Sequence, residues 1–566
     1  MIKYFYEKGQ LYNMKFTITY NGKSETFEKK VKLIELTNND KNFICANVNG
    51  RIRELDYDVY YDANVTFLTL ADHDAMGIYE KGIRFLFVMA SHLAYPGIKF
   101  KMTYSVSRSI FAQLISDDGK RSLFVTPSMV QKIEEKMCEI VEADYKFERL
   151  IKTNEEASKI YQEFNLLDKN SILEYRPEKT VHFYNCNGYF NYMYGRMVPS
   201  TGYLKNFKLR FYAPGILIQY PRSEYDGKIP PFKDEPTFSD TLINAQKWSS
   251  LVKLSTVSEI NKKIKDNELS VVELINLCEN KHNRMLCELG QKIEDQIDTI
   301  RLICIAGPSS SGKTTFADRL TMELKSRGIN PIRVSIDDYY KRREDVPLDD
   351  DGNYDFESIE ALDVDLFNED ILNLLNGQEV HLPTFSFKEN KRTFDRKVIL
   401  GPKDPIIIEG IHALNEKMTI SIPNYLKFKI YISPQAQINL DNENPISLTD
   451  IRLLRRIVRD NQYRGSSAIE TLSMWPSVRK GEFKWIYATQ EYANYVFDSF
   501  LNYELCVLSK HALPLLRKID PESEYGPDAE RLISLIKYFK PIDEKWIPCS
   551  SILKEFIGGS CYRDAK

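Results

Sequence analysis

Residues 307–315 read GPSSSGKTT and contain the pattern G-x-x-x-x-G-K-[ST], with its fixed positions at Gly307, Gly312, Lys313 and Thr314. The short apolar run RLICIA precedes the pattern, and FADRLTMELKSRG, whose apolar residues recur at helical spacing, follows it. A strand, a glycine-rich turn and a helix in this order are typical of a P-loop, in which backbone N–H groups and a helix N-terminus bind phosphate. The pattern therefore predicts a nucleotide phosphate site inside an α/β domain.

The P-loop pattern predicts a role for two side chains of this loop. We expect the Lys313 ammonium on the β- and γ-phosphates and the Thr314 hydroxyl on Mg²⁺. The predicted nucleotide-binding set is Gly307, Ser309, Ser310, Ser311, Gly312, Lys313, Thr314 and Thr315. Motors, switches and kinases all use such a loop, so the rest of the chain has to decide among them.

The size and composition of the chain limit its class. With 566 residues it is too long for one core, and we expect about three or four domains. Lys and Arg (77) nearly balance Asp and Glu (80), so bulk charge gives no reason to expect nucleic acid or an acidic membrane as the main partner. The nine scattered cysteines form no C-x-x-C pair and indicate reduced thiols. The most apolar stretch, IRFLFVMASHLAYPGI, is interrupted by Arg84 and His92, and the start lacks an apolar leader, so we expect a cytoplasmic protein without membrane contact.

The hydrophobic pattern divides the chain into four predicted segments. Residues 1–75 alternate as in strands, with NGK and NGR as turn signals, and predict a small β-rich module. Residues 76–250 mix strand and helix patterns and predict an α+β domain, with helices at 127–145 and strands in KLRFYAPGILIQYP. Residues 251–298 predict a helical connector. Residues 299–566 alternate strands with helices, which predicts a parallel sheet with helices on both faces.

The connector shows apolar residues at steps of three and four, the spacing of one helix face. The face that this spacing predicts to be buried consists of Val271, Ile275, Cys278, Met285, Leu289 and Ile293.

Two absences and one acid narrow the class of P-loop protein. A GTPase needs a guanine-reading N-K-x-D after the loop, and the chain has none. A motor or related ATPase would usually have a hydrophobic strand that ends in Asp-Glu, whereas IIIEG ends in the single acid Glu409. The balance favours a small-molecule kinase.

The next predicted strand, IRVSIDDYY, ends with Asp337 and Asp338. Ligands of α/β sheets bind at the carboxyl ends of the strands, where one of these acids could accept the proton of an attacking hydroxyl. A solvated acid pair that caps a turn is the alternative, and the place in a P-loop unit favours the catalytic interpretation for Asp337.

A predicted helix in DIRLLRRIVRDNQYRG carries Arg452, Arg455, Arg456 and Arg459 at steps of three and four. A face with so many arginines is costly unless an anion gathers there, and guanidinium groups stabilise the charge of a transferring phosphoryl group. A solvated basic face is the alternative, but the position after a P-loop favours a kinase lid.

Six ordered motifs, GPSSSGKTT, SIDDYY, YDFESIEALD, PTFSFKENKR, IEGIHAL and RLLRRIVRD, make residues 299 to about 520 resemble the uridine kinase and phosphoribulokinase group of P-loop kinases. The resemblance implies that Asp337 is the base towards a sugar hydroxyl and that Asp355 holds neighbouring sugar hydroxyls. It also implies that Tyr340 lies along a nucleoside. The implied donor is ATP, with GTP as the alternative.

The same resemblance implies a metal site and phosphate contacts. Thr314, Asp337 and Glu409 would position Mg²⁺, and Arg456 and Arg459 would reach the phosphates. Arg479, in the segment that follows the lid, is a weaker candidate for a phosphate contact.

The chain departs from its relatives where pyrimidine nucleoside kinases read the base. In place of the Tyr and His of P-x-Y-x-F-x-x-H it has Phe385 and Asn390, which leaves the preferred base open. If the acceptor were a phosphorylated sugar, Arg392 or another basic residue near the expected acceptor site would bind its second phosphate. His412 of IEGIHAL is expected to be structural.

Residues 14–250 are similar to the N-terminal modules of threonyl-tRNA synthetase, a ubiquitin-like TGS module and an editing domain. The metal-ligand positions of that editing family are occupied here by Lys81, Phe85, Met193 and Met197, so we do not expect metal-dependent editing. The two methionines are expected to fill a core. His182 and Cys186 form H-x-x-x-C, which we expect to be structural.

These features predict an ATP- and Mg²⁺-dependent kinase for a nucleoside 5′-hydroxyl, acting in nucleoside salvage. One alternative is a kinase of the same fold for another sugar or alcohol. A second is an RNA-binding regulatory protein in which the kinase domain is a nucleotide switch. The resemblance to oligomeric kinases also leaves a homo-oligomer open.

Overall fold

The computed structural model describes residues 15–104, 106–116, 123–264, 267–349, 352–386 and 389–562. Its contacts divide the chain into two compact units. Unit 1 comprises Met1–Lys233, Asn442–Asn444 and Ile519–Ser534, and unit 2 comprises Asp234–Asp441, Pro445–Lys518 and Leu535–Lys566. The finer division into four segments stays a prediction.

Unit 1 begins with a five-stranded sheet in the order β2-β1-β7-β4-β5. Its strands are β1 (Phe16–Tyr20), β2 (Lys23–Phe27), β4 (Cys45–Val48), β5 (Arg51–Glu54) and β7 (Ala63–Leu68). Strands β1 and β7 are parallel and the other neighbours antiparallel. The two predicted turn signals join hairpins, since Asn21-Gly22 and Asn49-Gly50 both have positive φ. A short pair, β3 (Val31–Lys32) and β6 (Asp58–Val59), and helix α1 (Leu33–Leu36) complete the module.

The rest of unit 1 contains two further antiparallel sheets. One has the order β13-β14-β9-β8, formed by β8 (Lys99–Tyr104), β9 (Ile110–Ile115), β13 (Lys208–Tyr212) and β14 (Gly215–Gln219). Helices α2 (His73–Ala94) and α3 (Pro127–Ala143) pack on each other. The other sheet is β10 (Glu148–Thr153), β11 (Thr180–Cys186) and β12 (Tyr189–Asn191), with α4 (Asn154–Glu163) and α5 (Leu167–Ile172). The late segment Ile519–Ser534 adds most of α14 (Gly526–Ile536) to this unit.

Three of the four positions that the resemblance to an editing domain singled out are buried and apolar in the structure. Phe85, Met193 and Met197 are buried in one hydrophobic core, as expected for the two methionines. The Lys81 pKa is lowered to about 8, by burial and then by the charge of Arg84. Cys186 is buried as well.

Unit 2 begins with α6 (Pro236–Leu251), α7 (Val257–Lys263) and α8 (Glu268–Glu294). The predicted buried face of α8 is right at Ile275, Cys278, Leu289 and Ile293 but wrong at two positions. Val271 and Met285 are only partly buried, whereas Leu274, Leu286 and the polar side chains Glu279, Lys281 and His282 are buried. These polar side chains can be buried because each has a hydrogen-bond partner. Tyr503 donates to Glu279, Lys281 donates to Asp498, and His282 Nε2 lies 3.1 Å from the Phe500 carbonyl oxygen.

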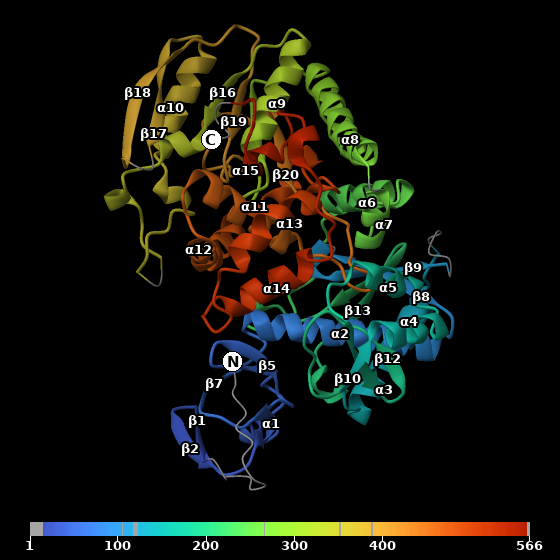
Figure 1. Cartoon of the computed structure of the whole chain (residues 1–566). Helices are drawn as coiled ribbons and strands as arrows, with labels where there is room; N and C mark the ends of the chain where they lie inside the picture. Colours follow the sequence, from blue (N-terminus) through green and yellow to red (C-terminus); the bar gives the residue numbers. More distant parts are fainter. Residues whose placement is uncertain are drawn as a thin grey trace. The chain divides into compact units, whose positions relative to one another are not determined.

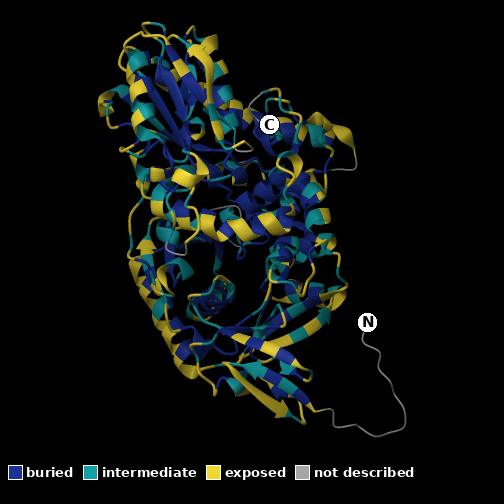
Figure 2. Cartoon of the chain, turned by 90° about the vertical axis from the view of Figure 1, so that its left-hand side faces the viewer, coloured by how far each residue is buried: buried dark blue, intermediate teal, exposed yellow. Residues whose placement is uncertain are grey.

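The core of unit 2 is a five-stranded sheet in the order β16-β19-β15-β20-β21. Its strands are β15 (Leu302–Ala306), β16 (Ile332–Ser335), β19 (Ile406–Glu409), β20 (Lys427–Ser433) and β21 (Tyr495–Asp498). All neighbours are parallel, which confirms the predicted parallel sheet. Strands β15 and β19 are buried at every residue (Figure 2). Their continuous apolar sequences are those of strands covered on both faces.

Helices and one hairpin surround this sheet (Figure 1). They are α9 (Lys313–Ser326), α10 (Val364–Leu375), α11 (Leu448–Tyr463), α12 (Ala468–Gly481), α13 (Glu504–Leu516), α15 (Lys554–Ile557) and the pair β17 (Val380–Ser386) and β18 (Lys391–Val398). Helix α9 contacts β15 and β19. None of the helices in the described ranges combines the length and apolarity needed to cross a bilayer.

Candidate active site

The predicted P-loop lies between β15 and α9, and its geometry explains its glycines. A Cβ on Gly307 would lie 2.0 Å from the Ile432 carbonyl oxygen, so this position has no room for a side chain. Gly312 has φ +90° and is the residue before α9, a conformation that favours glycine. The Lys313 ammonium donates to the carbonyl oxygens of Gly307 (3.0 Å) and Pro308 (3.2 Å), so it lies over the loop.

Three hydroxyls of the loop and first turn fit a phosphate ligand. Ser310 Oγ, Ser311 Oγ and Thr315 Oγ1 are buried and have no hydrogen-bond partner among the residues that the structure describes. Buried hydroxyls are costly without a partner, and phosphate oxygens next to these donors would provide one. The cradle therefore matches the group that its sequence predicts.

Two predicted acids meet beside this loop at the carboxyl ends of neighbouring strands. Asp337 lies in a 3-10 turn (Ile336–Tyr339) after β16, and Glu409 is the last residue of β19. Burial, then the Asp337 charge, raises the pKa of Glu409 to about 7. Desolvation also raises the pKa of Asp337, against the lowering effect of the Lys313, Arg464 and Arg459 charges. The acids and Lys313 thus form one charge cluster, as the motif order predicts.

Glu357 belongs to the same cluster and was missed by sequence reasoning. Burial raises its pKa to about 7, the Glu482 and Asp337 charges add to the rise, and Arg456 and Lys313 oppose it. Asp355, the predicted acid, lies two residues earlier and its backbone N–H donates to Pro347 O at 2.8 Å. The segment YDFES carries acids at both positions, and the pattern alone could not decide which one faces the cluster.

His412 contacts the backbone of Glu357. Its Nε2 lies 2.9 Å from the Glu357 backbone oxygen, and burial lowers its pKa to about 4. Its ring contacts that of Trp485 in an edge arrangement. These contacts agree with a structural role.

Two of the four predicted arginines on α11 have guanidinium groups that are paired with glutamates and also bind the P-loop backbone. Arg452 makes two hydrogen bonds to Glu482, and Arg455 makes two to Glu504 at 2.8 and 2.6 Å. The two arginines and their two glutamate partners are all buried. Both arginines also donate to P-loop carbonyl oxygens, Arg452 to Ser309 and Arg455 to Ser310.

The other two arginines differ from this pair. Arg456 donates to Ser309 Oγ at 2.8 Å and pairs with Asp460 at 3.2 Å, while Arg459 pairs with Asp460 at 2.7 Å. Arg464, just beyond the end of α11, also acts on Asp337 electrostatically. The set of lid arginines predicted from the sequence ended at Arg459 and so did not include it.

Arg479 does not reach the loop directly in this structure. Its guanidinium donates to Glu482 and to Tyr487 Oη, 2.7 Å away. Because Glu482 also accepts the backbone N–H of Ser309 at 3.2 Å, Arg479 acts on the loop through this carboxylate.

The predicted acceptor residues divide into two groups. Tyr340 and Phe385 have ring centroids 6.2 Å apart, and the Tyr340 hydroxyl donates to Phe356 O at 2.9 Å. Asn390 and Arg392 have partners of their own: the Asn390 side-chain oxygen accepts the Arg343 backbone N–H at 3.0 Å, and Arg392 pairs with Asp363 at 3.0 Å. The aromatic pair remains the candidate surface for a base.

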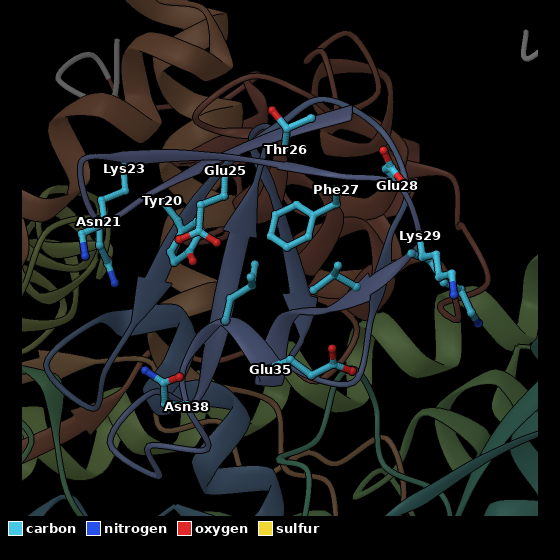
Figure 3. A pocket seen from close by; sticks show the side chains of 13 residues that line it. Tyr20, Asn21, Lys23, Glu25, Thr26, Phe27, Glu28, Lys29, Glu35 and Asn38 are labelled. Carbon is cyan, nitrogen blue, oxygen red and sulfur yellow. The ribbon is translucent and has the colours of Figure 1, made fainter. Parts of the chain in front are cut away.

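A surface hollow of about 890 Å³ lies elsewhere, in unit 1 (Figure 3). Strands β1 and β2 and helix α1 form it, and its rim mixes lysines such as Lys23 and Lys29 with acids such as Glu25 and Glu35. It contains none of the predicted phosphoryl-transfer residues, so we do not place the reaction there.

Comparisons with known proteins match a segment that lies mostly in unit 2. A sequence model described as the phosphoribulokinase / uridine kinase family matches residues 302–503. Uridine kinases of Staphylococcus aureus strains JH9 and Newman are each 31% identical over 196 residues, which is 34% of this chain and 86% of those proteins. A putative fructose transport system kinase from Silicibacter sp. TM1040 matches in structure with TM-score 0.26 and 18% identity, over 38% of this chain and 98% of that one. A possible uridine kinase from Bacillus stearothermophilus matches with TM-score 0.25 and 20% identity, over 37% of this chain and all of that one (100%).

The parallel sheet, the phosphate cradle and the matched sequence define a P-loop phosphotransferase. Through residues 302–503, the chain belongs to the phosphoribulokinase / uridine kinase family.

Proposed function

We propose that this protein transfers the γ-phosphoryl group of ATP, in the presence of Mg²⁺, to the 5′-hydroxyl of a nucleoside. The observation that carries the proposal is the cluster of Asp337, Glu409 and Lys313 beside a loop with three unpartnered buried hydroxyls. Membership of the family and the likeness to uridine kinases support it. GTP is the alternative donor.

On the donor side, the chain supplies charge and hydrogen-bond donors. The backbone N–H groups and hydroxyls of residues 307–315 would bind the phosphates, with Lys313 on the β- and γ-phosphates. Arg456 and Arg459 would neutralise charge on the transferring oxygens and, with α11, exclude water. Thr314, Asp337 and Glu409 would hold Mg²⁺, which would supply positive charge to offset the negative charge of the phosphates.

On the acceptor side, Asp337 would orient the 5′-hydroxyl and accept its proton as the phosphoryl group leaves. Asp355 and Glu357 would hold the neighbouring hydroxyls, and the charge interactions of Glu357 with Asp337 and Lys313 support this role. The faces of Tyr340 and Phe385 would lie along the base. The Asn390 amide would need to leave Arg343 to contact it.

The alternative acceptor, a phosphorylated sugar, has weaker support. It needs a cation for the second phosphate, and the sequence candidate Arg392 already pairs with Asp363. The second alternative is an RNA-binding regulatory protein with a nucleotide switch. In that case, the TGS- and editing-like modules proposed for the first half would bind RNA through phosphate contacts with a steep salt dependence.

The test is acceptor-stimulated ADP release by the purified full-length protein with MgATP. The acceptor panel contains ribonucleosides, deoxyribonucleosides and ribulose 5-phosphate. We expect stimulation by a nucleoside and none by ribulose 5-phosphate. Stimulation by the sugar phosphate alone would favour the first alternative. ATP binding without stimulation by any acceptor would reject the kinase proposal and favour the regulatory one.

A further inference from the structure

Two exposed cysteines lie side by side near the C-terminal end of unit 2. The backbone N–H of Cys561 donates to the Cys549 carbonyl oxygen at 3.0 Å. Residues joined by such a main-chain bond have Cα atoms about 5 Å apart, inside the range that a disulfide spans. Burial and a side-chain hydrogen bond with Cys549 raise the pKa of Cys561, so the thiols themselves are also in contact.

The chain between the two cysteines packs on the P-loop and its helix. Ile552 is fully buried, and its Cγ2 lies 2.4 Å from where a Cβ on Gly312 would be. The buried Phe556 ring lies 5.0 Å from the Arg455 guanidinium, which itself holds the loop. Gly558 and Gly559, both with positive φ, turn the chain back so that Cys561 meets Cys549.

One side chain of this segment occupies a phosphate-type position. Glu555 Oε2 accepts the backbone N–H of Thr315 at 3.1 Å. Thr315 is the third residue of α9, so its N–H has no partner within the helix and is one of the groups that bind anions at a helix start. A carboxylate there competes with a phosphate oxygen for the same donor.

We propose that Cys549 and Cys561 form a reversible disulfide that holds Glu555 on the Thr315 amide and thereby weakens nucleotide binding. The pair is a modification site for low-molecular-weight disulfides such as oxidised glutathione. The reaction converts two protein thiols and one small disulfide into one protein disulfide and two small thiols. Two electrons and two protons pass to the small disulfide.

The disulfide affects nucleotide binding because it limits the movement of residues 549–561. In the reduced protein the segment can swing away so that a phosphate displaces Glu555. In the oxidised protein the closed ring restricts this movement, and the Glu555 contact persists. Disulfides of this kind in reducing compartments are transient and regulatory, which agrees with the reduced thiols expected from the sequence.

The first measurement is tryptic mapping of the full-length protein after equilibration with oxidised glutathione. Trypsin cuts after Lys545, Lys554 and Arg563, so WIPCSSILK and EFIGGSCYR separate in the reduced protein. We expect them joined by one disulfide in the oxidised protein and released by dithiothreitol. If both cysteines instead carried glutathione and the two peptides were not joined, the proposal would be overturned.

The second measurement is binding of a fluorescent ATP analogue to the reduced and the oxidised protein. We expect oxidation to weaken binding by about tenfold. Cys561→Ser should bind as the reduced protein does in both conditions. Glu555→Ala, which removes the acceptor of the Thr315 N–H, should form the disulfide but lose most of the redox effect. Cys138→Ser, which removes an exposed cysteine of unit 1, is the matched control and should behave as the unmodified chain.

The nucleotide part of this inference rests on the proposed function, and the two fail in distinguishable ways. A mapped disulfide with unchanged binding of the analogue would overturn the inference and leave the kinase proposal standing. No binding of the analogue even by the reduced protein would contradict the nucleotide site itself, and with it the regulatory consequence of the disulfide.

Discussion

The Arg456 guanidinium donates a 2.8 Å hydrogen bond to the Ser309 hydroxyl, which ties helix α11 to the P-loop. Burial lowers the pKa of Arg456, and the nearby Arg459 charge lowers it further, while the Asp460 carboxylate opposes both. Two neighbouring buried cations repel each other, and a bound polyanion would offset this repulsion. This arrangement agrees with the proposal that α11 contacts the phosphate oxygens of a nucleotide.

Arg456→Ala is expected to lower turnover by about two to three decades, because our proposal places its guanidinium group on the transferring phosphoryl group. Steady-state ADP release with saturating acceptor measures the loss. Arg284→Ala, which removes an exposed arginine of α8, is the control and should leave turnover unchanged. An Arg456→Ala protein with full turnover would exclude this residue from the phosphate contacts.

Asp337→Asn is expected to lower turnover by about two to four decades while ATP-analogue binding stays near normal. The amide keeps the size of the side chain but cannot accept the hydroxyl proton. Asp338→Asn serves as the comparison, because the Asp338 carboxylate accepts the Phe385 backbone N–H at 3.1 Å and an amide oxygen can do the same. Equal losses in the two variants would mean that Asp337 acts through structure and not as a base.

Glu409 should make stability depend on pH in the absence of nucleotide and Mg²⁺. Its folded pKa of about 7 lies above the usual value of a glutamate, so the folded protein keeps a proton that the unfolded chain loses. The stabilisation from this proton is fully present below about pH 4.5 and is lost as the pH rises through about 7.

Glutamine cannot ionise, so the Glu409→Gln variant does not lose stability as the pH rises. It should melt a few degrees (roughly 2–4 °C) above the unmodified protein at pH 8, with a much smaller difference near pH 5. Thermal unfolding followed at several pH values gives the comparison. Glu273→Gln, at an exposed position of α8, should show no pH-dependent difference. A gap of the same size at pH 5 and pH 8 would contradict a raised pKa at Glu409.

The sequence predicted the parts of the site that depend on local order. The P-loop between a strand and a helix, the acids after β16 and the acid that ends β19 all follow from motif and strand patterns. The parallel sheet then brings these strand ends to one edge. Local patterns therefore predicted that Asp337, Glu409 and Lys313 lie close together, and their roles in catalysis stay predictions.

The missed residues depend on tertiary contacts that no local pattern encodes. Glu357 and Asp355 both fit the sequence, and only packing places Glu357 in the charge cluster. Glu482 and Glu555 lie far from the P-loop in sequence, yet each accepts one of its backbone N–H groups. The predicted buried face of α8 was wrong at Met285, because charged side chains with buried partners share that face of the helix.

Gly307→Ala is expected to abolish ATP-analogue binding while most of the fold persists. The added methyl would lie 2.0 Å from the Ile432 carbonyl oxygen and 2.9 Å from Ser311 Oγ, so the loop has to move away from β20. A displaced loop can no longer aim its N–H groups at one phosphate, and positioning errors of about 1 Å cost roughly two decades in activity.

Gly77→Ala is the matched control for this substitution. Gly77 lies inside α2, and a methyl group added there would have no described atom within 4 Å, so alanine should leave nucleotide binding unchanged and stabilise the helix by up to about 1 kcal/mol. Fluorescence titration with the ATP analogue and circular dichroism separate binding from folding. If Gly307→Ala bound the analogue normally, the close approach of the loop to β20 would not be needed for the phosphate site.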